Sequence, residues 1–366
     1  MPAHDEPTRA NHGLGPVSVV VCNYQGERYL DELLDSVERL RGRVDEVLVV
    51  DNASTDASRE IVARRGGRVR WIDMGRNDGP CPARNAGMRA AKNRWVLALD
   101  NDAVCTEDML DRLCAAAASV PNVAIVQPRS VFAGDRSRVH YDGGAFHYAG
   151  LIALRNFYVP LAEAEGRGVV DVDCAVAVAL LVDRDAVLAA GGYDETMFIL
   201  FEDLDLSFRL RAEGRRVMSV EDAIVLHKGG TPGISFRDGP AYPRSRVFFH
   251  SRNRWTYMAK CFRVRTLIVA APGIALYEAV WFVFALAQGG LVDWFRGKAR
   301  FLASIGHVRR ERARLAARRT VPDRELLVGG PLTITPALTG GVRRLVLGAL
   351  DRTLRAWWGI ARHVAG

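Results

Sequence analysis

Cysteine is scarce in this chain, and the cysteines are not spaced for a metal site or a disulfide framework. Six cysteines are spread over 366 residues, and no two form a C-x-x-C pair. A zinc site and a disulfide-stapled scaffold are therefore not indicated. The first fifteen residues are polar and lack the apolar stretch of a secretory signal. We expect a catalytic part that works in the reducing environment of the cytosol.

Two glycine-rich phosphate-binding signatures are also missing. No G-x-G-x-x-G follows the first apolar run, which argues against a dinucleotide-dependent oxidoreductase. No G-x-x-x-x-G-K-[ST] loop occurs, which argues against a P-loop kinase.

Short apolar runs recur through the first third of the chain, and each has the length of a buried strand. Helical patterns fill the gaps between them. Alternating strands and helices predict an α/β fold with a mainly parallel sheet that helices cover on both faces. The runs are Val17–Val21, Val47–Val50, Val69–Ile72, Trp95–Leu99 and Val123–Val126.

The run Trp95–Leu99 ends in the triplet Asp100, Asn101 and Asp102. Side chains two apart on a strand point the same way, so the two carboxylates converge. Hard oxygen ligands at a rigid strand end suit Mg²⁺ or Mn²⁺, which keeps positions open for substrate phosphates. Such a triplet alone is most often a solvated turn, so its neighbours decide the interpretation.

The other apolar runs also end in polar loops. Asn23 and Tyr24 follow the first run, and Asp51 opens the segment Asp51–Asp56 after the second. Asn77 lies in the loop Gly75–Pro80, and Arg84 lies just beyond it. Ligands of open α/β sheets bind at the carboxyl ends of the strands, where these side chains are expected.

The first strand, the segment Asp51–Asp56, the segment around Arg84 and the triplet Asp100–Asp102 follow one another along the chain as they do in the family 2 glycosyltransferases, which this sequence resembles. The resemblance implies a GT-A nucleotide-diphospho-sugar transferase fold, with a mainly parallel mixed sheet flanked by helices. It also implies that the triplet holds a divalent metal, Mn²⁺ or Mg²⁺, through Asp100 and Asp102. The donor-binding residues that it implies are Asn23, Tyr24, Asp51, Asn77, Arg84, Asp100 and Asn101.

The resemblance continues to about Gly230. It implies that Glu202 and Asp203 line the acceptor side, with Asp203 as the catalytic base of an inverting transfer, and that His227 completes the metal shell. A positioned carboxylate is the group that a sugar hydroxyl needs to become a nucleophile. Gly191, Gly192 and Trp255 are further candidates for the acceptor side.

Each of these side chains also has a purely structural interpretation. Glu202 and Asp203 can cap a helix that runs to about Ala212 and favour its dipole. Arg84 can be a solvated helix arginine, and His227 can merely end a strand. The sequence leaves these alternatives open.

Charge divides the chain in two. Residues 241–366 contain 22 Lys or Arg and 6 Asp or Glu, a net charge of +16, against −8 for residues 1–240. The arginines flank strongly apolar segments, which favours a membrane surface over nucleic acid as the partner. We expect a flexible N-terminus at residues 1–15, a catalytic domain at residues 16–240 and a basic, helical, membrane-associating region at residues 241–366.

Residues 266–292 contain a single charged residue, Glu278, and are long enough to span a bilayer. Glu278 would cost about 2.5 to 3.5 kcal/mol at the centre of a span, and we expect Pro272 and Gly273 to break the helix. Helices that lie in the cytoplasmic leaflet are therefore favoured, while a true span and a soluble core helix stay open. Residues 342–364 mix leucine, tryptophan and arginine, which suits either a membrane interface or docking on the domain.

The resulting hypothesis is a metal-dependent inverting glycosyltransferase on the cytoplasmic face of the plasma membrane. It would move a sugar from a UDP- or dTDP-sugar to a hydroxyl of a lipid-linked glycan in envelope polysaccharide synthesis, as in the rhamnosyl- and galactofuranosyltransferases that the tail resembles. Ser251–Trp255 departs from the Q-x-x-R-W motif of processive relatives, which favours single additions. A sugar-nucleotide nucleotidyltransferase, a non-catalytic nucleotide-binding scaffold and a homo-oligomer stay open.

Overall fold

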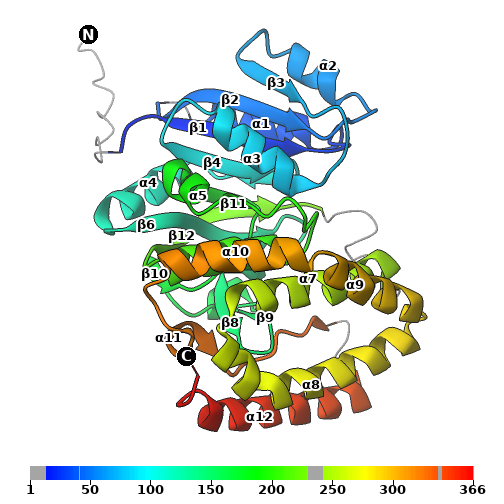
Figure 1. Ribbon diagram of the computed structural model, residues 1–366. Coiled ribbons are helices and arrows are strands. Elements are labelled where there is room, and N and C mark those ends of the chain that lie inside the picture. The colour runs from blue at the N-terminus through cyan, green and yellow to red at the C-terminus, as the bar shows by residue number, and fades with distance from the viewer. Residues whose placement is uncertain (1–13, 41, 230–241, 337–339, 366) are drawn as a thin grey trace, which may run out of the picture.

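A computed structural model describes residues 14–40, 42–229, 242–336 and 340–365. The expected flexible N-terminus is thus described only at residues 14 and 15, and the expected domain boundary at residue 240 lies outside the described residues. Within the described part, a large mixed sheet forms the upper half of the molecule, and the C-terminal helices form the lower half (Figure 1).

Ten of the described strands form one sheet, in the order β10-β12-β6-β11-β4-β1-β2-β3, with β5 on β12 and β7 on β6. The strands β1 to β4 pair in parallel, whereas β11 runs antiparallel between β4 and β6. All five predicted runs are strands of this sheet. The strands are β1 (Val17–Asn23), β2 (Val44–Asp51), β3 (Val69–Asp73), β4 (Trp95–Asp100), β5 (Ala103–Cys105), β6 (Val123–Phe132), β7 (Val139–Tyr141), β10 (Val169–Val172), β11 (Ala179–Asp183) and β12 (Arg216–His227).

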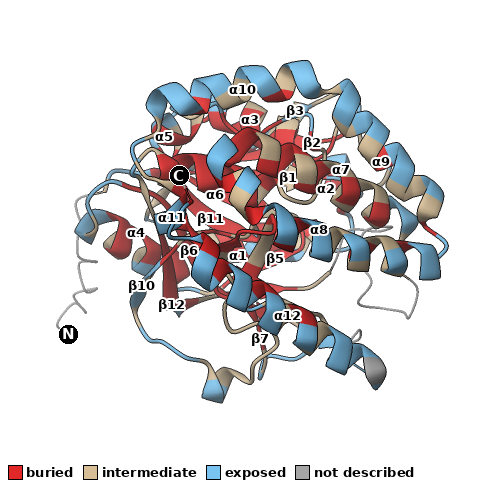
Figure 2. Ribbon diagram, turned by 60° about the horizontal axis from the view of Figure 1, so that its bottom comes forward, coloured by how far each residue is buried: buried red, intermediate tan, exposed pale blue. Residues whose placement is uncertain are grey.

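Helices cover both faces of the sheet, as the apolar runs predict. Val19 and Val21 of β1 belong to the core under α1 and α4, whereas Val20 belongs to the core under α3 and α6. Figure 2 shows buried residues concentrated in the strands and in the helix faces turned toward them. These helices are α1 (Leu30–Glu38), α2 (Ser58–Ala63), α3 (Pro80–Ala90), α4 (Met109–Ser119), α5 (Arg184–Ala189) and α6 (Glu202–Ala212).

The C-terminal region shares a core and a sheet with the preceding part of the chain. Leu327 of β13 pairs in parallel with Phe146 of β8, and Tyr148 stacks on Trp358 with ring centroids 4.7 Å apart. The small sheet contains β8 (Gly144–His147), β9 (Leu151–Leu154) and β13 (Leu327–Val328), and a 3-10 helix, η1, spans Leu161–Glu163. The helices are α7 (Arg244–Cys261), α8 (Val264–Ala287), α9 (Leu291–Ala303), α10 (Ile305–Arg318), α11 (Asp323–Leu326) and α12 (Val342–Ala361).

Helix α8 is continuous, so the expectation that Pro272 and Gly273 break it is wrong. Its 24 residues run through Pro272. A side chain at Gly273 would meet the phenol of Tyr148, so the glycine lets the helix pack closely on the body of the protein. This tertiary packing compensates for the one backbone hydrogen bond that proline removes.

Glu278, the charged residue of α8, points toward the protein. Its carboxylate accepts hydrogen bonds from Arg254 Nη1 at 2.6 Å, Trp255 Nε1 at 2.9 Å and Trp294 Nε1 at 3.0 Å, and pairs with Lys298. Among the described helices, α8 is the one that is long and apolar enough to cross a membrane. Only 22% of its most apolar 18-residue stretch is buried in the protein, so most of that stretch is exposed. Because the Glu278 carboxylate has its partners inside the protein, the outer face of α8 can be apolar.

Candidate functional site

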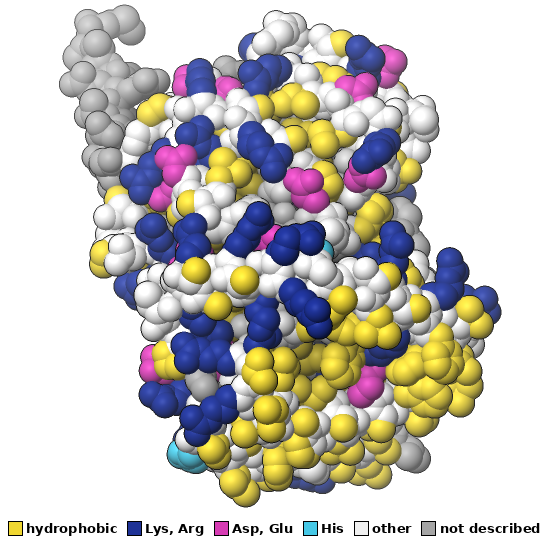
Figure 3. Space-filling model, viewed as in Figure 1, with side chains coloured by type: hydrophobic (Ala, Val, Ile, Leu, Met, Phe, Trp, Pro, Cys, Tyr) yellow, Lys and Arg dark blue, Asp and Glu magenta, His cyan; other side chains and the backbone are white. Residues whose placement is uncertain are grey.

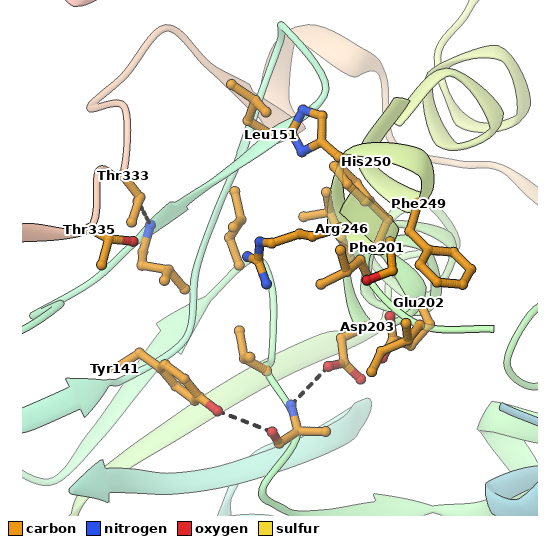
Figure 4. Close-up of a pocket in the computed structure, with 18 of the residues that line it drawn as sticks. Tyr141, Leu151, Phe201, Glu202, Asp203, Arg246, Phe249, His250, Thr333 and Thr335 are labelled. Atoms are coloured by element: carbon orange, nitrogen blue, oxygen red, sulfur yellow. Dashed lines mark hydrogen bonds between the residues drawn. The ribbon is translucent and has the colours of Figure 1, made fainter. Parts of the chain in front are cut away.

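A cavity of about 1,540 Å³ opens at the carboxyl ends of the central strands and extends down to α8 and α12. Asp100 and Asn101 line it from the end of β4, and Glu202 and Asp203 line it from the start of α6. Figure 4 shows side chains from the small sheet, α6 and α7 facing this space. The cavity therefore brings together the triplet and the downstream acidic pair, as the sequence predicts.

Arg84 is the central charge at the end of the cavity where Asp100 and the acidic pair lie. Its Nη2 donates to Asp100 Oδ1 at 2.7 Å, and its Nη1 lies 3.7 Å from Glu202 Oε1 and 3.8 Å from Asp203 Oδ1. The side chain is 5% exposed, so the interpretation as a solvated helix arginine is wrong. Burial acts to lower the pKa of Arg84, but Asp100 and other nearby groups outweigh it and raise that pKa.

The loop before α3 aims Arg84 into the cavity. Gly79 precedes the helix with a φ of 89°, and Pro80 occupies the first position of α3. A side chain at Gly79 would collide with the backbone of Phe198. The helix therefore starts against the loop that carries the acidic pair.

Asp203 lines the cavity beside Arg84. Its Oδ2 accepts from the backbone N–H of Ala177 at 3.0 Å (Figure 4), while Oδ1 is buried and lies 3.8 Å from Arg84 Nη1. Burial raises the pKa of both Asp203 and Glu202 above the usual carboxyl range, and the adjacent Asp203 charge raises that of Glu202 further. The predicted helix is confirmed, because α6 runs from Glu202 to Ala212 with both carboxylates in its first turn, but neither side chain caps it: Phe201 is the N-cap residue, and both carboxylates line the cavity.

The loop that leads into α6 has an unusual backbone. Phe198, Leu200 and Phe201 all have positive φ angles, between 59° and 74°. Non-glycine residues in this region cost about 1 to 3 kcal/mol each and concentrate at functional sites. Asn253 of α7 holds the loop by donating to the carbonyls of Met197, Ile199 and Leu200.

Asp102 and His227 form the second polar cluster of the cavity. Pairing of β5 with β12 places His227 opposite Ala103, and the imidazole Nε2 lies 3.2 Å from Asp102 Oδ2. His227 Nδ1 lies 3.0 Å from Nδ1 of His140, a cavity residue for which the sequence gave no signal. A partner on the other ring nitrogen is typical of histidines that hold metals.

These two residues fit a divalent cation better than the whole predicted ligand set does. Two ligands of one octahedral ion, each about 2.1 Å from it, stand about 3.0 Å apart. The 3.2 Å separation of Asp102 Oδ2 and His227 Nε2 is compatible with that spacing and equally with a direct hydrogen bond. Asp100 instead pairs with Arg84. In the described part of the chain, no three His, Cys, Asp or Glu side chains converge on one point.

The predicted donor residues lie in two layers. Tyr24, Asn77 and Asn101 line the cavity. Asn23 and Asp51 are buried, and Asn23 Nδ2 donates to Asp51 Oδ1 at 2.7 Å. The structure therefore places these two where they brace the loops, and their contact with a donor stays a prediction.

Gly191, Gly192 and Trp255 are not among the residues that line this cavity. Gly192 has a φ of 68° and sits against Asn85, whose side chain binds the backbone of Tyr193. Trp255 faces a separate apolar cavity of about 680 Å³ that includes residues of α8. The glycines serve a tight turn, which a motif alone does not distinguish from a ligand contact.

The lower end of the cavity was missed by sequence reasoning. Arg246 and His250 of α7 face it, together with Thr333 and Thr335 (Figure 4). Residues of α8 and α12 complete the lining. These residues follow no local motif, and they meet only because α7, α8 and α12 pack together.

Comparison with known sequences finds a matching family model and several relatives. Residues 18–174 match the family model "Glycosyl transferase family 2". The succinoglycan biosynthesis protein ExoO of Rhizobium meliloti is 40% identical over 98 residues, which are 26% of this chain and 28% of that protein. An N-acetylglucosaminyl-diphospho-decaprenol L-rhamnosyltransferase of Mycobacterium tuberculosis is 28% identical over 262 residues, 66% of this chain and 83% of that enzyme.

A solved structure shares the fold. GalNAc-T7, crystallised with UDP, GalNAc and Mn²⁺, superposes with a TM-score of 0.53 at 16% identity. The superposition covers 80% of this chain and 57% of GalNAc-T7. This superposition shows a GT-A fold, and the family match over residues 18–174 with the glycosyltransferase relatives shows that the chain is a glycosyltransferase with a domain similar to glycosyl transferase family 2.

Proposed function

We propose that the chain transfers one sugar, with inversion, from a nucleoside-diphosphate donor to a hydroxyl of a lipid-linked glycan. One observation carries the proposal: Arg84 lies between Asp100 at the end of β4 and the Glu202–Asp203 pair at the start of α6, all in one cavity. A cation for the leaving phosphate and a buried carboxylate for the nucleophile are the two groups that glycosyl transfer needs.

In the proposed transfer, Asp203 and Arg84 account for the proton and for the charge of the leaving group. Asp203 takes the proton of the acceptor hydroxyl, whose oxygen bonds to the anomeric carbon from the face opposite the diphosphate. The bond between that carbon and the phosphate oxygen breaks, and its electron pair leaves with the nucleoside diphosphate. Arg84 offsets the negative charge on the diphosphate. One displacement inverts the anomeric centre.

Asp102 and His227, with Asp100 as a further candidate, would hold Mn²⁺ or Mg²⁺. The ion would neutralise diphosphate charge when bound. The oxygen and nitrogen donors of Asp102 and His227, which lie side by side in the cavity lining, support this assignment. GalNAc-T7 also binds Mn²⁺.

The acceptor assignment and the location rest on the lower half. Exposed apolar side chains lie along α8 and α12, and Glu278 is paired on the protein side, which favours a helix lying in the cytoplasmic leaflet over a span. The rhamnosyltransferase relative acts on a decaprenol-linked sugar, and ExoO on succinoglycan biosynthesis, by their names. A nucleic acid partner is not part of this proposal, and self-association stays a prediction.

The structure gives no support to the two rival functions. A nucleotidyltransferase would need a glycine-rich cationic loop after β1, and the segment there instead binds Ser54 through Asn23 and Gln25. A scaffold would not need a buried Asp203 beside Arg84. Measuring sugar transfer distinguishes the two, because a scaffold binds the nucleotide without turning it over.

Calorimetry of UDP, dTDP, GDP and CDP, with and without Mn²⁺, tests the donor site directly. We expect one nucleotide to bind tightly only when Mn²⁺ is present, and Asp102→Ala to abolish that dependence. Asp108→Asn changes an exposed carboxylate at the start of α4 that does not line the cavity, so it is the matched control and should bind normally. Folded protein that binds none of the four nucleotides would contradict the proposal.

A further inference from the structure

The cavity is larger than a donor site requires. Clefts for small ligands occupy roughly 300 to 1,000 Å³, whereas this cavity holds about 1,540 Å³. Its far end lies beyond Asp203, between α7, α8 and α12. A second substrate therefore has room beside the donor, on the side of the proposed base.

The lining changes character toward that end. The four acidic residues among the described lining all belong to the catalytic end: they are Asp100, Asp102, Glu202 and Asp203. The far end is lined by apolar side chains together with Arg246, His250 and Arg343. The apolar lining residues from α8 and α12 are Val280, Trp281, Val283, Phe284, Ala287, Val346, Leu347 and Leu350.

Arg246 lies where the two ends meet. From α7 it reaches into the space between Asp203 and Thr335 (Figure 4), and its Nε donates to Tyr242 Oη at 3.2 Å. His250, one turn further along α7, contacts Tyr277 Oη through Nε2 at 3.3 Å. Burial, with Arg254 and Arg246 nearby, holds the pKa of His250 well below its usual range, so the imidazole is neutral.

The far end opens onto the apolar face of the molecule. Val283 of α8 and Val346 of α12 both line the cavity, and yet they are 62% and 49% exposed. Apolar side chains gather over the lower part of the molecule in Figure 3, where Figure 1 places α8 and α12. Ile268, Leu276, Leu286, Leu345 and Ile360 of these helices are exposed as well. Exposed apolar area of this kind marks a surface that meets another apolar phase.

We propose that this end of the cavity binds the isoprenoid diphosphate of the acceptor, with Arg246 at the phosphates and the groove between α8 and α12 around the first part of the hydrocarbon chain. The inference rests on the proposed function, because it places the lipid part of that acceptor. A cation beside an apolar groove suits an anion attached to hydrocarbon, since each half of such a ligand meets its complement. The chain would enter from the membrane through the opening between Val283 and Val346.

Binding of farnesyl diphosphate to the full chain tests the site. The donor site is first saturated with the preferred nucleotide and Mn²⁺, so that the probe cannot occupy it. We expect binding that Arg246→Ala weakens about tenfold or more, while Arg246→Lys, which keeps the charge, loses less. Arg244→Ala is the matched control, because Arg244 lies on the same helix, is exposed and does not line the cavity. Equal affinity in wild type and Arg246→Ala would overturn the inference.

Pyrophosphate and farnesol separate the two halves of the ligand. We expect Val346→Asn to weaken farnesyl diphosphate but to leave pyrophosphate unchanged, because the substitution changes only the wall for the chain. Farnesyl diphosphate that binds no more tightly than pyrophosphate would show a phosphate site without a lipid groove, and the inference would be wrong.

Kinetics with a lipid-linked acceptor distinguish the two proposals. In Arg246→Ala we expect a higher KM for the acceptor and an unchanged KM for the donor. Wild-type transfer together with an unchanged acceptor KM in the variant would overturn the lipid site and leave the glycosyltransfer intact. Failure of every nucleotide to bind would instead contradict the proposed function itself.

Discussion

The two ends of the cavity are built on different principles. At the catalytic end, Arg84 and Glu202 are buried, and Asp100 and Asp203 are partly buried. Arg84 donates to Asp100, and the backbone of Ala177 donates to Asp203. At the other end, helices contribute apolar walls and a few cations. Bond making needs atoms fixed to fractions of an ångström, whereas holding a hydrocarbon chain needs mainly area and volume. The comparison explains why one end is rigid and polar and the other is wide and apolar.

Removing the base breaks the catalytic end alone and has the largest expected effect. Asp203→Asn keeps the shape of the side chain and the hydrogen bond from Ala177. We expect kcat to fall about 10²- to 10⁴-fold, with nucleotide affinity near that of the wild type. Steady-state kinetics and calorimetry on the same preparation measure both quantities. Near-normal turnover in the folded variant would show that Asp203 is not the base.

Removing Glu278 breaks the wall of the other end. Glu278→Ala leaves Arg254, which is 1% exposed, without its carboxylate partner. Breaking a buried pair in this way costs about 3 to 5 kcal/mol, so we expect a much lower denaturation midpoint. Adding Arg254→Met should restore part of the loss.

An exposed pair gives the contrast for that measurement. Asp108→Asn disrupts an exposed ion pair with Arg112 on α4 and should cost less than about 1 kcal/mol. Equal losses for Glu278→Ala and Asp108→Asn would show that the buried network does not hold α8 to the body of the protein.

The contact between His307 of the C-terminal helices and Asp194 of the preceding part of the chain gives the smallest expected effect on stability, and that effect depends on pH. His307 of α10 contacts Asp194 at 3.1 Å, and this hydrogen bond raises the pKa of His307, with Lys260 acting to lower it and Glu311 to raise it. Because the folded-state pKa lies above the ordinary value of about 6.5, the stabilisation is complete below that pH. It is lost as the pH rises through the folded-state pKa.

Thermal denaturation measures this contribution when the wild type and His307→Gln are compared from about pH 5.5 to about pH 9, which spans the range where histidine titrates. We expect the wild type to be more stable at the acid end and the difference to shrink toward the alkaline end. A difference that grows with pH would mean that the contact with Asp194 does not stabilise the protonated imidazole.

The strands and most of the catalytic end could be predicted because their signals are local. Apolar runs of strand length ended in Asp100 and Asp102, and the helix at Glu202 had its acidic first turn in the sequence itself. The continuous helix α8 could not be predicted, because what sustains it at Pro272 is packing of Gly273 against Tyr148, more than 120 residues away. The roles of Gly192 and Trp255 were likewise set by distant partners, Asn85 and Glu278.

The sequence by itself determined the α/β alternation, the polar strand ends, the charge division and the similarity to family 2 glycosyltransferases, because each depends on residues near one another along the chain. Only the tertiary structure decided that Arg84 is buried among carboxylates, that Glu278 turns inward and that Arg246 reaches the catalytic cavity. The physical reason is burial. Desolvation and pairing act over a few ångströms in space, and chain segments far apart in the sequence supply the partners.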